Sequence, residues 1–269
     1  ITTINIGAAM LKNIDLKSKL KDPSLLKSQA YINGKWVGSK SGKTFPVYNP
    51  STGEIIIDVP DMGVEDLKVA LDGAYKAQKI WSAKTGKERA GILKKWNDLM
   101  LENADDLAAI LTAEMGKPLA EARGEIVYGA SFIEWFAEEA KRVYGETIPG
   151  HQPDKRIMVI KQPVGVVASI TPWNFPNAMI TRKAGPALAS GCAFVAKPAG
   201  ETPLSGLVMV ELAERAGVPA GVFSMVTSKK SSDIGKEMCS NSKVRKLTFT
   251  GSTEVGRILM KQGSENILK

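Results

Sequence analysis

Histidine and cysteine are scarce in this chain of 269 residues, which contains one histidine, His151, and two cysteines, Cys192 and Cys239. A single histidine excludes metal sites built from several histidines, and His151 alone is left for a serine–histidine–aspartate triad. Because His151 lies in the turn-rich sequence Pro-Gly-His-Gln-Pro, we interpret it as an exposed loop residue. Two cysteines cannot form a disulfide framework and fit a reducing compartment. We therefore expect no metal site and interpret both cysteines as buried packing residues.

Long apolar runs and aromatic residues are also in short supply. No run approaches the roughly 20 residues of a membrane-spanning helix, so we expect no membrane partner. Aromatic residues make up 6% of the chain, and the basic residues behind its net charge of +8 are scattered rather than clustered. This pattern argues against a nucleic-acid partner and indicates a solvated surface with some attraction for anionic metabolites. The apolar content of 43% can bury a substantial core in one large or two modest domains.

The first part of the chain divides into a tail, a hairpin and a helical stretch. Residues 1–27 are polar and rich in lysine, and we expect a loosely attached tail. The chain opens with isoleucine, so either its true start lies upstream or a leader was removed. Asn33-Gly34 between two apolar arms predicts a tight hairpin, because both central positions of such a turn need positive φ.

Apolar residues at three-to-four spacing predict helices over 64–82, 85–100, 105–115 and 118–144. We expect the charged residues of the last helix to face outward as a solvated surface. These residues are Glu121, Arg123, Glu125, Glu138, Glu139 and Lys141.

A projecting β-hairpin is predicted over 145–163. Turn signals surround a strand-like run at 156–161, and the run at 145–148 is suited to pair with it. The connection is too polar to belong to a core, so the hairpin projects from the body. Projecting apolar strands have unpaired edges, which proteins usually hide by pairing with another chain. We therefore expect an oligomer contact at 145–163.

From residue 164 onward, predicted strands and helices alternate. The strand candidates carry little charge, as buried parallel strands do, and the segments between them are long enough for helices. This alternation predicts an α/β fold with a doubly wound parallel sheet, for which a dinucleotide is the default ligand. Strands are predicted over 164–170, 193–196, 222–226 and 246–250, and helices over 176–189, 203–216, 232–239 and 254–262.

Small and polar residues follow the predicted strands, where ligands collect in open α/β sheets. Gly251 and Ser252 open a helix whose free N–H groups suit a pyrophosphate, unless Ser252 is simply a helix cap. Lys197 ends another strand and suits ribose or phosphate, although a lone lysine is usually a solvated strand end. Asn174 either donates to a developing oxyanion or satisfies local carbonyls in a turn. Arg182 is either a surface residue or an anion clamp.

Taken together, these motifs resemble the NAD(P)-dependent aldehyde dehydrogenase superfamily. The similarity extends from about Gln29 to the last residue, and further motifs make the chain most similar to the succinate-semialdehyde dehydrogenases. The superfamily motifs are Ile-Thr-Pro-Trp-Asn-Phe-Pro at 170–176, Lys-Pro-Ala at 197–199, Pro203, Ala-Gly-Val-Pro-Ala-Gly-Val at 216–222 and Phe-Thr-Gly-Ser-Thr-Glu-Val-Gly-Arg at 249–257. The narrower motifs are Phe-Ile-Glu-Trp-Phe-Ala-Glu-Glu at 132–139, Arg-Val-Tyr-Gly at 142–145, Lys-Gln-Pro at 161–163 and Ala-Met-Ile-Thr-Arg-Lys at 178–183.

The resemblance implies oxidation of succinate semialdehyde to succinate with NADP or NAD. In the family a cysteine thiolate attacks the aldehyde, and an asparagine that matches Asn174 holds the resulting oxyanion. Hydride then passes to nicotinamide, and a glutamate activates water to hydrolyse the thioester. Arg182 matches an arginine that binds the far carboxylate of the substrate. The residues that match the family's cofactor site are Ile170, Thr171, Pro172, Trp173, Asn174, Lys197, Pro198, Ala199, Gly200, Gly251 and Ser252.

A domain organisation follows from the same resemblance. Residues 28–144 and 164–269 match a discontinuous dinucleotide-binding domain, and 145–163 matches an oligomerisation hairpin. The family's nucleophilic cysteine and its base glutamate lie beyond the position of Lys269, and the surroundings of Cys192 and Cys239 do not match the nucleophile. We therefore expect the catalytic domain to be absent and this piece to be inactive alone. We expect the full-length form to be a homo-oligomer, a dimer or tetramer, in the cytoplasm or the mitochondrial matrix.

Two alternatives stay open, and cofactor preference can be taken one step further. The chain is either a dehydrogenase for another carboxylated or aliphatic aldehyde, or a non-catalytic NAD(P)-binding module made by truncation or splicing.

Many NAD-preferring relatives carry a glutamate where this chain has Gly200, so no carboxylate repels a 2′-phosphate there and Lys197 remains to pair with it. NADP should therefore be accepted, unless Glu201 takes the missing role. The segment 228–232 departs from the glycine-rich turn of many relatives.

Overall fold

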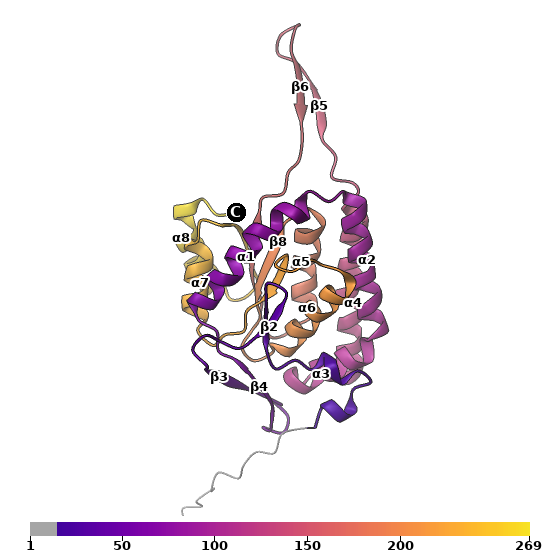
Figure 1. The fold of residues 1–269 in the computed structure, drawn as a ribbon, viewed down its shortest axis with the longest axis vertical. Coiled ribbons are helices and arrows are strands. Elements are labelled where there is room, and N and C mark those ends of the chain that lie inside the picture. The colour runs from indigo at the N-terminus through magenta and orange to yellow at the C-terminus, as the bar shows by residue number, and fades with distance from the viewer. Residues whose placement is uncertain (1–14) are drawn as a thin grey trace, which may run out of the picture.

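The computed structural model describes residues 15–269, in which a six-stranded sheet lies between layers of helices (Figure 1). The strand order is β10-β7-β8-β9-β1-β2, and the first four strands run parallel. Two antiparallel pairs, β3–β4 and β5–β6, stand apart from this sheet. The strands are β1 Ala30–Ile32, β2 Lys35–Val37, β3 Thr44–Tyr48, β4 Ile55–Pro60, β5 Glu146–Pro149, β6 Arg156–Val159, β7 Val166–Ile170, β8 Ala193–Lys197, β9 Phe223–Met225 and β10 Val244–Phe249. The helices are α1 Val64–Ser82, α2 Gly86–Glu102, α3 Ala104–Met115, α4 Leu119–Glu139, α5 Ala178–Ala189, α6 Leu204–Ala216, α7 Ser231–Ser240 and α8 Thr253–Gly263, with short 3₁₀ turns at Lys17–Lys19, Pro23–Leu25 and Ser264–Asn266.

Helices cover both faces of the sheet, as a doubly wound fold requires. Helices α1 and α7 pack on one face, whereas α5 and α6 pack on the other and are covered in turn by α2, α3 and α4 (Figure 1). Successive residues of a strand point to opposite faces. Val166 and Ala168 of β7 accordingly belong to the apolar cluster of α1 and α7, while Val167 between them belongs to the other cluster. The predicted α/β class with a parallel sheet is confirmed.

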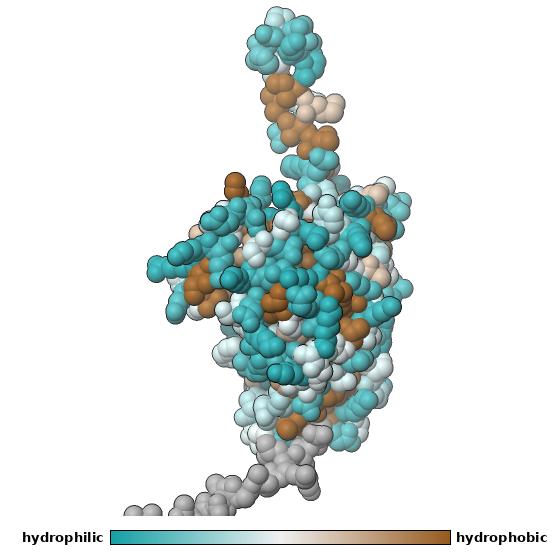
Figure 2. Space-filling view, turned by 60° about the vertical axis from the view of Figure 1, so that its left-hand side comes forward, coloured by the Kyte–Doolittle hydropathy of each residue, from teal (hydrophilic) through white to brown (hydrophobic). Residues whose placement is uncertain are grey.

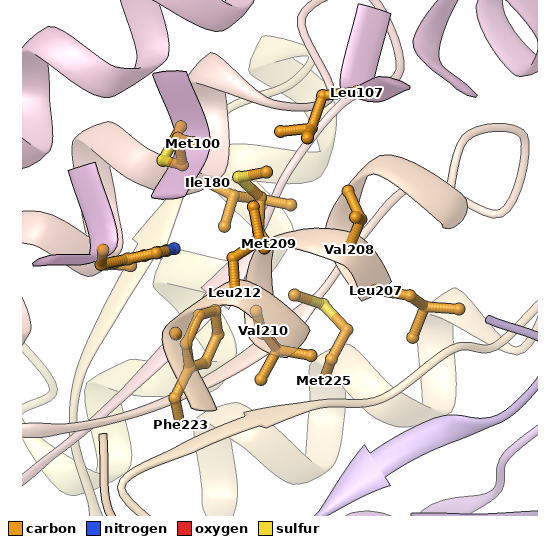
Figure 3. Close-up of a cluster of buried hydrophobic side chains, with 14 of the residues drawn as sticks. Met100, Leu107, Ile180, Leu207, Val208, Met209, Val210, Leu212, Phe223 and Met225 are labelled. Carbon is orange, nitrogen blue, oxygen red and sulfur yellow. The ribbon is translucent and has the colours of Figure 1, made fainter. Parts of the chain in front are cut away.

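The larger apolar cluster surrounds helix α6. Figure 3 shows Met100 of α2, Leu107 of α3 and Ile180 of α5 near α6, together with Phe223 and Met225 of β9. Each of these five side chains is at most 1% exposed. Burial of one such side chain contributes about 1.5–3 kcal/mol. This packing fixes α5 and α6, and with them the loops that lead into both helices from the sheet.

The Asn33-Gly34 turn forms the tight hairpin that the sequence predicts. Asn33 has φ 54° and Gly34 has φ 80°, so both central residues take the left-handed conformation. Strand β1 of this hairpin joins the parallel sheet in the opposite direction, with Tyr31 paired to Met225 of β9. The sheet is therefore mixed, and the hairpin covers the edge that β9 would otherwise leave open.

Residues 15–27 differ from the loosely attached tail that we expected. Leu16, Leu20, Leu25 and Leu26 are all buried in the larger apolar cluster. The side chain of Asp106 accepts the backbone N–H groups that follow Leu20, at 2.9 and 2.8 Å. The lysines hide this pattern in the sequence because they alternate with the buried leucines. The rest of the predicted tail, residues 1–14, lies outside the described residues.

The hairpin predicted over 145–163 is present as β5 and β6. The two strands pair antiparallel, from Glu146 opposite Val159 to Pro149 opposite Arg156. They extend away from the body, and apolar side chains gather along the stem below a hydrophilic tip (Figure 2). Met158 is 75% exposed. The hairpin itself is confirmed, while its contact with another chain stays a prediction.

Candidate functional site

Loops at the carboxyl ends of β7, β8 and β10 meet around a cleft of about 250 Å³. These strands are neighbours in the sheet and run parallel, so their ends lie at one edge, where doubly wound folds bind ligands. The first turn of helix α8 lines the same cleft. The predicted cofactor residues that line it are Ile170, Thr171, Pro172, Lys197, Ala199, Gly200, Gly251 and Ser252.

Lys197 brings a buried cation to this cleft. It is the last residue of β8, is 3% exposed, and donates from Nζ to the carbonyl of Pro198 at 3.1 Å. Burial lowers the pKa of Lys197 to about 8, although the negative charge of Glu201 acts to raise it. Glu201 pairs instead with Lys229 at 3.7 Å, and within residues 15–269 no carboxylate forms an ion pair with Lys197. A buried ammonium without a counterion suits an anionic ligand.

Gly251 and Ser252 also line the cleft. Ser252 is the N-cap of α8, and its Oγ accepts the backbone N–H of Val255 at 3.3 Å. The helix-cap interpretation of Ser252 is therefore correct, and the cap also places the helix N-terminus at the cleft. A Cβ at Gly251 would lie 2.4 Å from Cζ of Phe249, so no larger residue fits without moving that ring. Gly251 and Ser252 are both exposed, so their backbone is accessible to a ligand.

A buried hydroxyl adds to the fit with a dinucleotide. Thr171 is 4% exposed and lines the cleft, and its Oγ1 has no hydrogen-bond partner in the described structure. Buried hydroxyls are normally paired, so an orphaned one at a ligand cleft is a candidate contact. A buried cation, an orphaned hydroxyl and a helix N-terminus together fit the phosphates and ribose of NADP or NAD.

The segment after β9 also reaches the cleft, although we predicted no cofactor residue in it. Ser228, Lys229 and Ser231 line it. Lys229 approaches Gly200 so closely that a Cβ at Gly200 would lie 2.9 Å from its Cδ. The sequence does indicate this position, because 228–232 follows the predicted strand 222–226, and the carboxyl end of that strand lies on the same edge of the sheet.

Three predicted cofactor residues do not line the cleft. Trp173 is 54% exposed, and Asn174 is also exposed in the loop between β7 and α5. The carbonyl of Asn174 accepts a hydrogen bond from Nζ of Lys117 at 3.1 Å. Pro198 contributes its carbonyl to Lys197. Asn174 lies two residues after Pro172, which does line the cleft, and its role as oxyanion donor stays a prediction.

Arg182 lies on helix α5 and does not line the cleft. Its Nη2 donates to the hydroxyl of Tyr128 at 2.6 Å, and its guanidinium lies 4.7 Å from the ring centroid of Phe132. It lines a separate cavity of about 500 Å³, together with Lys183 and Thr248. Among residues 15–269, Nε of Arg182 is buried without a hydrogen-bond partner. The clamp assigned to Arg182 also stays a prediction.

His151 is exposed and both cysteines are buried, as expected. In the part of the chain from residue 15 to residue 269, no three His, Cys, Asp or Glu side chains are grouped so that they could hold a metal ion. No helix within those same residues combines the length and apolarity needed to cross a membrane.

Comparisons with known proteins cover nearly the whole chain. Residues 36–269 match the model of the aldehyde dehydrogenase family. Glutarate-semialdehyde dehydrogenase of Pseudomonas aeruginosa is 62% identical over 93% of this chain and 52% of that protein. The NADP(+) succinate-semialdehyde dehydrogenase of Escherichia coli is 59% identical over the same shares. The crystal structure of succinate-semialdehyde dehydrogenase from Burkholderia pseudomallei superposes with a TM-score of 0.92 at 58% identity, over 93% of this chain and 52% of that one.

The chain thus spans about half the length of the curated relatives it matches. The family model nevertheless covers every residue of the cleft, from Ile170 to Val255. This chain belongs to the aldehyde dehydrogenase family.

Proposed function

We propose that this chain forms the NADP- or NAD-binding part of a semialdehyde dehydrogenase that oxidises succinate semialdehyde to succinate. The cleft with its buried, unpaired Lys197 carries the proposal, because it offers an anion site at the ligand-binding edge of the sheet. The bound dinucleotide would supply the hydride acceptor. The chain itself would orient the dinucleotide and present the side-chain amide of Asn174 to the oxyanion.

The cysteines of the chain do not suit the nucleophilic step. Cys192 is 3% exposed and Cys239 is fully buried, and burial raises the pKa of Cys239. A buried thiol that keeps its proton is a poor nucleophile. The proposal therefore assigns cofactor binding and oxyanion stabilisation to residues 1–269, which would not turn over an aldehyde alone.

A carboxylated aldehyde is the proposed substrate class. Arg182 lines a cavity of about 500 Å³ and offers a planar guanidinium, the group that matches a carboxylate fork. The names of the relatives point to substrates of this class, since both succinate and glutarate semialdehyde carry a carboxylate at the far end. The alternative is a dehydrogenase for an aldehyde without a carboxylate, which would leave the guanidinium of Arg182 without a role in substrate binding.

Calorimetry of the chain with NADP and with NAD tests the cofactor proposal. The expected result is heat of binding with at least one dinucleotide, and tighter binding of NADP because Gly200 places no carboxylate near a 2′-phosphate. As a control, Lys230→Met should bind both dinucleotides as the wild type does, since Lys230 is exposed beside the cleft without lining it. Absence of heat with both dinucleotides would contradict the proposal, including the alternative of a non-catalytic binding module.

A chimera tests the activity. Residues 1–269 would replace the matching half of the E. coli relative, and reduction of NADP in the presence of succinate semialdehyde would be followed at the absorbance of the reduced cofactor. We expect turnover, and we expect Arg182→Leu to raise KM for succinate semialdehyde while an uncharged aldehyde is unaffected. An unchanged KM would rule out the clamp. A folded chimera that binds NADP without turnover would favour the non-catalytic module.

We further propose that the full-length form is a homo-oligomer, a dimer or tetramer, assembled through the hairpin β5–β6. Its strands are exposed and carry apolar side chains on a stem with open edges. A reducing compartment, cytoplasm or mitochondrial matrix, is proposed because both cysteines are free thiols.

A further inference from the structure

An ion pair is buried next to the Asn174 loop, outside the cleft. Nζ of Lys117 lies 2.6 Å from Oε2 of Glu125, and the two side chains are 9% and 1% exposed. Lys117 lies between α3 and α4, and Glu125 is in the second turn of α4. Taking such a pair out of water costs several kcal/mol per ion, which its mutual attraction does not reliably offset. Stability alone is therefore a weak explanation for its presence.

Both members of the pair hold the same segment of backbone. Besides Glu125, Nζ of Lys117 binds the carbonyl of Asn174 at 3.1 Å and lies 3.8 Å from the ring centroid of Phe175. Oε1 of Glu125 accepts the backbone N–H groups of Asn177 and Ala178 at 2.9 and 3.2 Å. One charged unit thus fixes the loop at Asn174 and again at the start of α5.

A second buried glutamate provides an internal comparison. Glu114 accepts the backbone N–H groups of Leu204 and Ser205, both at 2.7 Å, at the start of α6. Glu114 uses one carboxylate oxygen for each N–H, whereas Glu125 accepts both on Oε1 and keeps Oε2 for Lys117. Within the described residues Glu114 forms no ion pair with a lysine or arginine. A glutamate alone can therefore hold a helix N-terminus in this fold. The additional element at α5 is Lys117, and its further bonds go to Asn174 and Phe175.

We infer that Lys117 and Glu125 are positioning residues that set the place and direction of Asn174. This inference rests on the proposed role of Asn174 as oxyanion donor. Neither Lys117 nor Glu125 is assigned a contact with the substrate. The carbonyl that Lys117 holds belongs to the residue whose side chain must aim at the oxyanion. Fixing that peptide group fixes the origin of the side chain, and catalytic groups lose efficiency steeply when they are displaced by about 1 Å.

Fluorine NMR of the 269-residue chain labelled with fluorotryptophan tests the inference, because Trp173 adjoins Asn174. Lys117→Met keeps the apolar stem and removes both bonds of the ammonium. We expect the Trp173 resonance to shift by more than its linewidth or to split, while those of the buried Trp81 and Trp96 stay in place. Lys117→Arg should restore the wild-type position, because arginine also donates to a carbonyl and a carboxylate. Lys68→Met, which breaks the exposed pair with Glu65, is the matched control.

The outcomes separate this inference from the proposed function. An unmoved Trp173 resonance in Lys117→Met overturns the positioning role, and so does an equal shift of all tryptophans in a folded protein. If Lys117→Met does not fold, Glu125→Gln decides, since its amide oxygen still accepts from Asn177 while its charge is lost. An unmoved Trp173 resonance in that variant overturns the inference as well. Failure of the wild-type chain to bind NADP would contradict the proposed function, but it would not change the Trp173 resonance shifts that test the positioning role.

Discussion

Replacing Lys197 by methionine should change folding stability and cofactor binding in opposite directions. Lys197 is 3% exposed, and burial lowers its pKa from 10.5 to about 8. The folded state therefore disfavours the proton that the unfolded chain holds. Stability associated with this group is complete above pH 10.5 and is lost as the pH falls through about 8. At pH 7 the chain carries the full cost of a buried ammonium.

The size of the effect follows from the shift. Each pKa unit corresponds to about 1.4 kcal/mol, so a fall from 10.5 to about 8 corresponds to about 3 kcal/mol. Methionine removes that cost but also removes the hydrogen bond to the carbonyl of Pro198, worth about 1 kcal/mol. Lys197→Met should therefore raise the free energy of unfolding at pH 7 by about 2 kcal/mol. Loss of a charge-assisted bond to the ligand should weaken NADP binding by about 1.5–3 kcal/mol, roughly 10- to 150-fold.

Urea unfolding and calorimetry on the same preparations test both signs. The stability gain should shrink as the pH rises from 8 to 10.5, because the folded wild type has then released the proton that the unfolded chain still holds, and its own stability rises with pH. Lys230→Met should change neither quantity. A variant that is less stable at pH 7, or one that binds NADP as tightly as the wild type, would refute the reasoning that Lys197 is a desolvated cation kept for a ligand.

Three further perturbations follow from the structure. Burial raises the pKa of Glu114 to about 8, so the contribution of Glu114 to the free energy of unfolding should fall by about 1.4 kcal/mol per pH unit between about pH 5 and 8. Glu114→Gln should remove this slope, which urea unfolding at several pH values measures. Gly251→Ala places a Cβ against the Phe249 ring and should lower stability by about 1–3 kcal/mol and weaken NADP binding. Gly38→Ala should do neither, because a Cβ there meets no atom of residues 15–269 within 4 Å. Met158→Glu on the hairpin should shift any dimer or tetramer toward the monomer in sedimentation velocity without lowering Tm, and an unchanged distribution would contradict assembly through β5–β6.

The parts of this molecule that the sequence predicts well depend on local signals. Lys197 ends a strand, and Gly251 and Ser252 lie between a strand and a helix, so the hydrophobic pattern alone places them at one edge of a parallel sheet. The Asn33-Gly34 turn was equally local. In contrast, the pairing of Tyr31 with Met225 joins segments far apart in the chain, and no turn or period at either end indicates the partner.

Glu125 shows where the same local reasoning went wrong. We expected it on the solvated face of its helix, yet it is 3% exposed. Ala122 and Gly129 stand three residues before and four residues after it, and both belong to the buried stripe, so the helical period already placed Glu125 on that stripe. A charge on a buried stripe requires a partner, and charge alone does not say which one. The partner, Lys117, and the loop that the pair holds, 57 residues from Lys117, emerge only when α4 and α5 pack together. Residues that act by positioning a loop are for this reason harder to predict than residues that meet the ligand, since their role is defined by a contact between elements rather than by a motif within one.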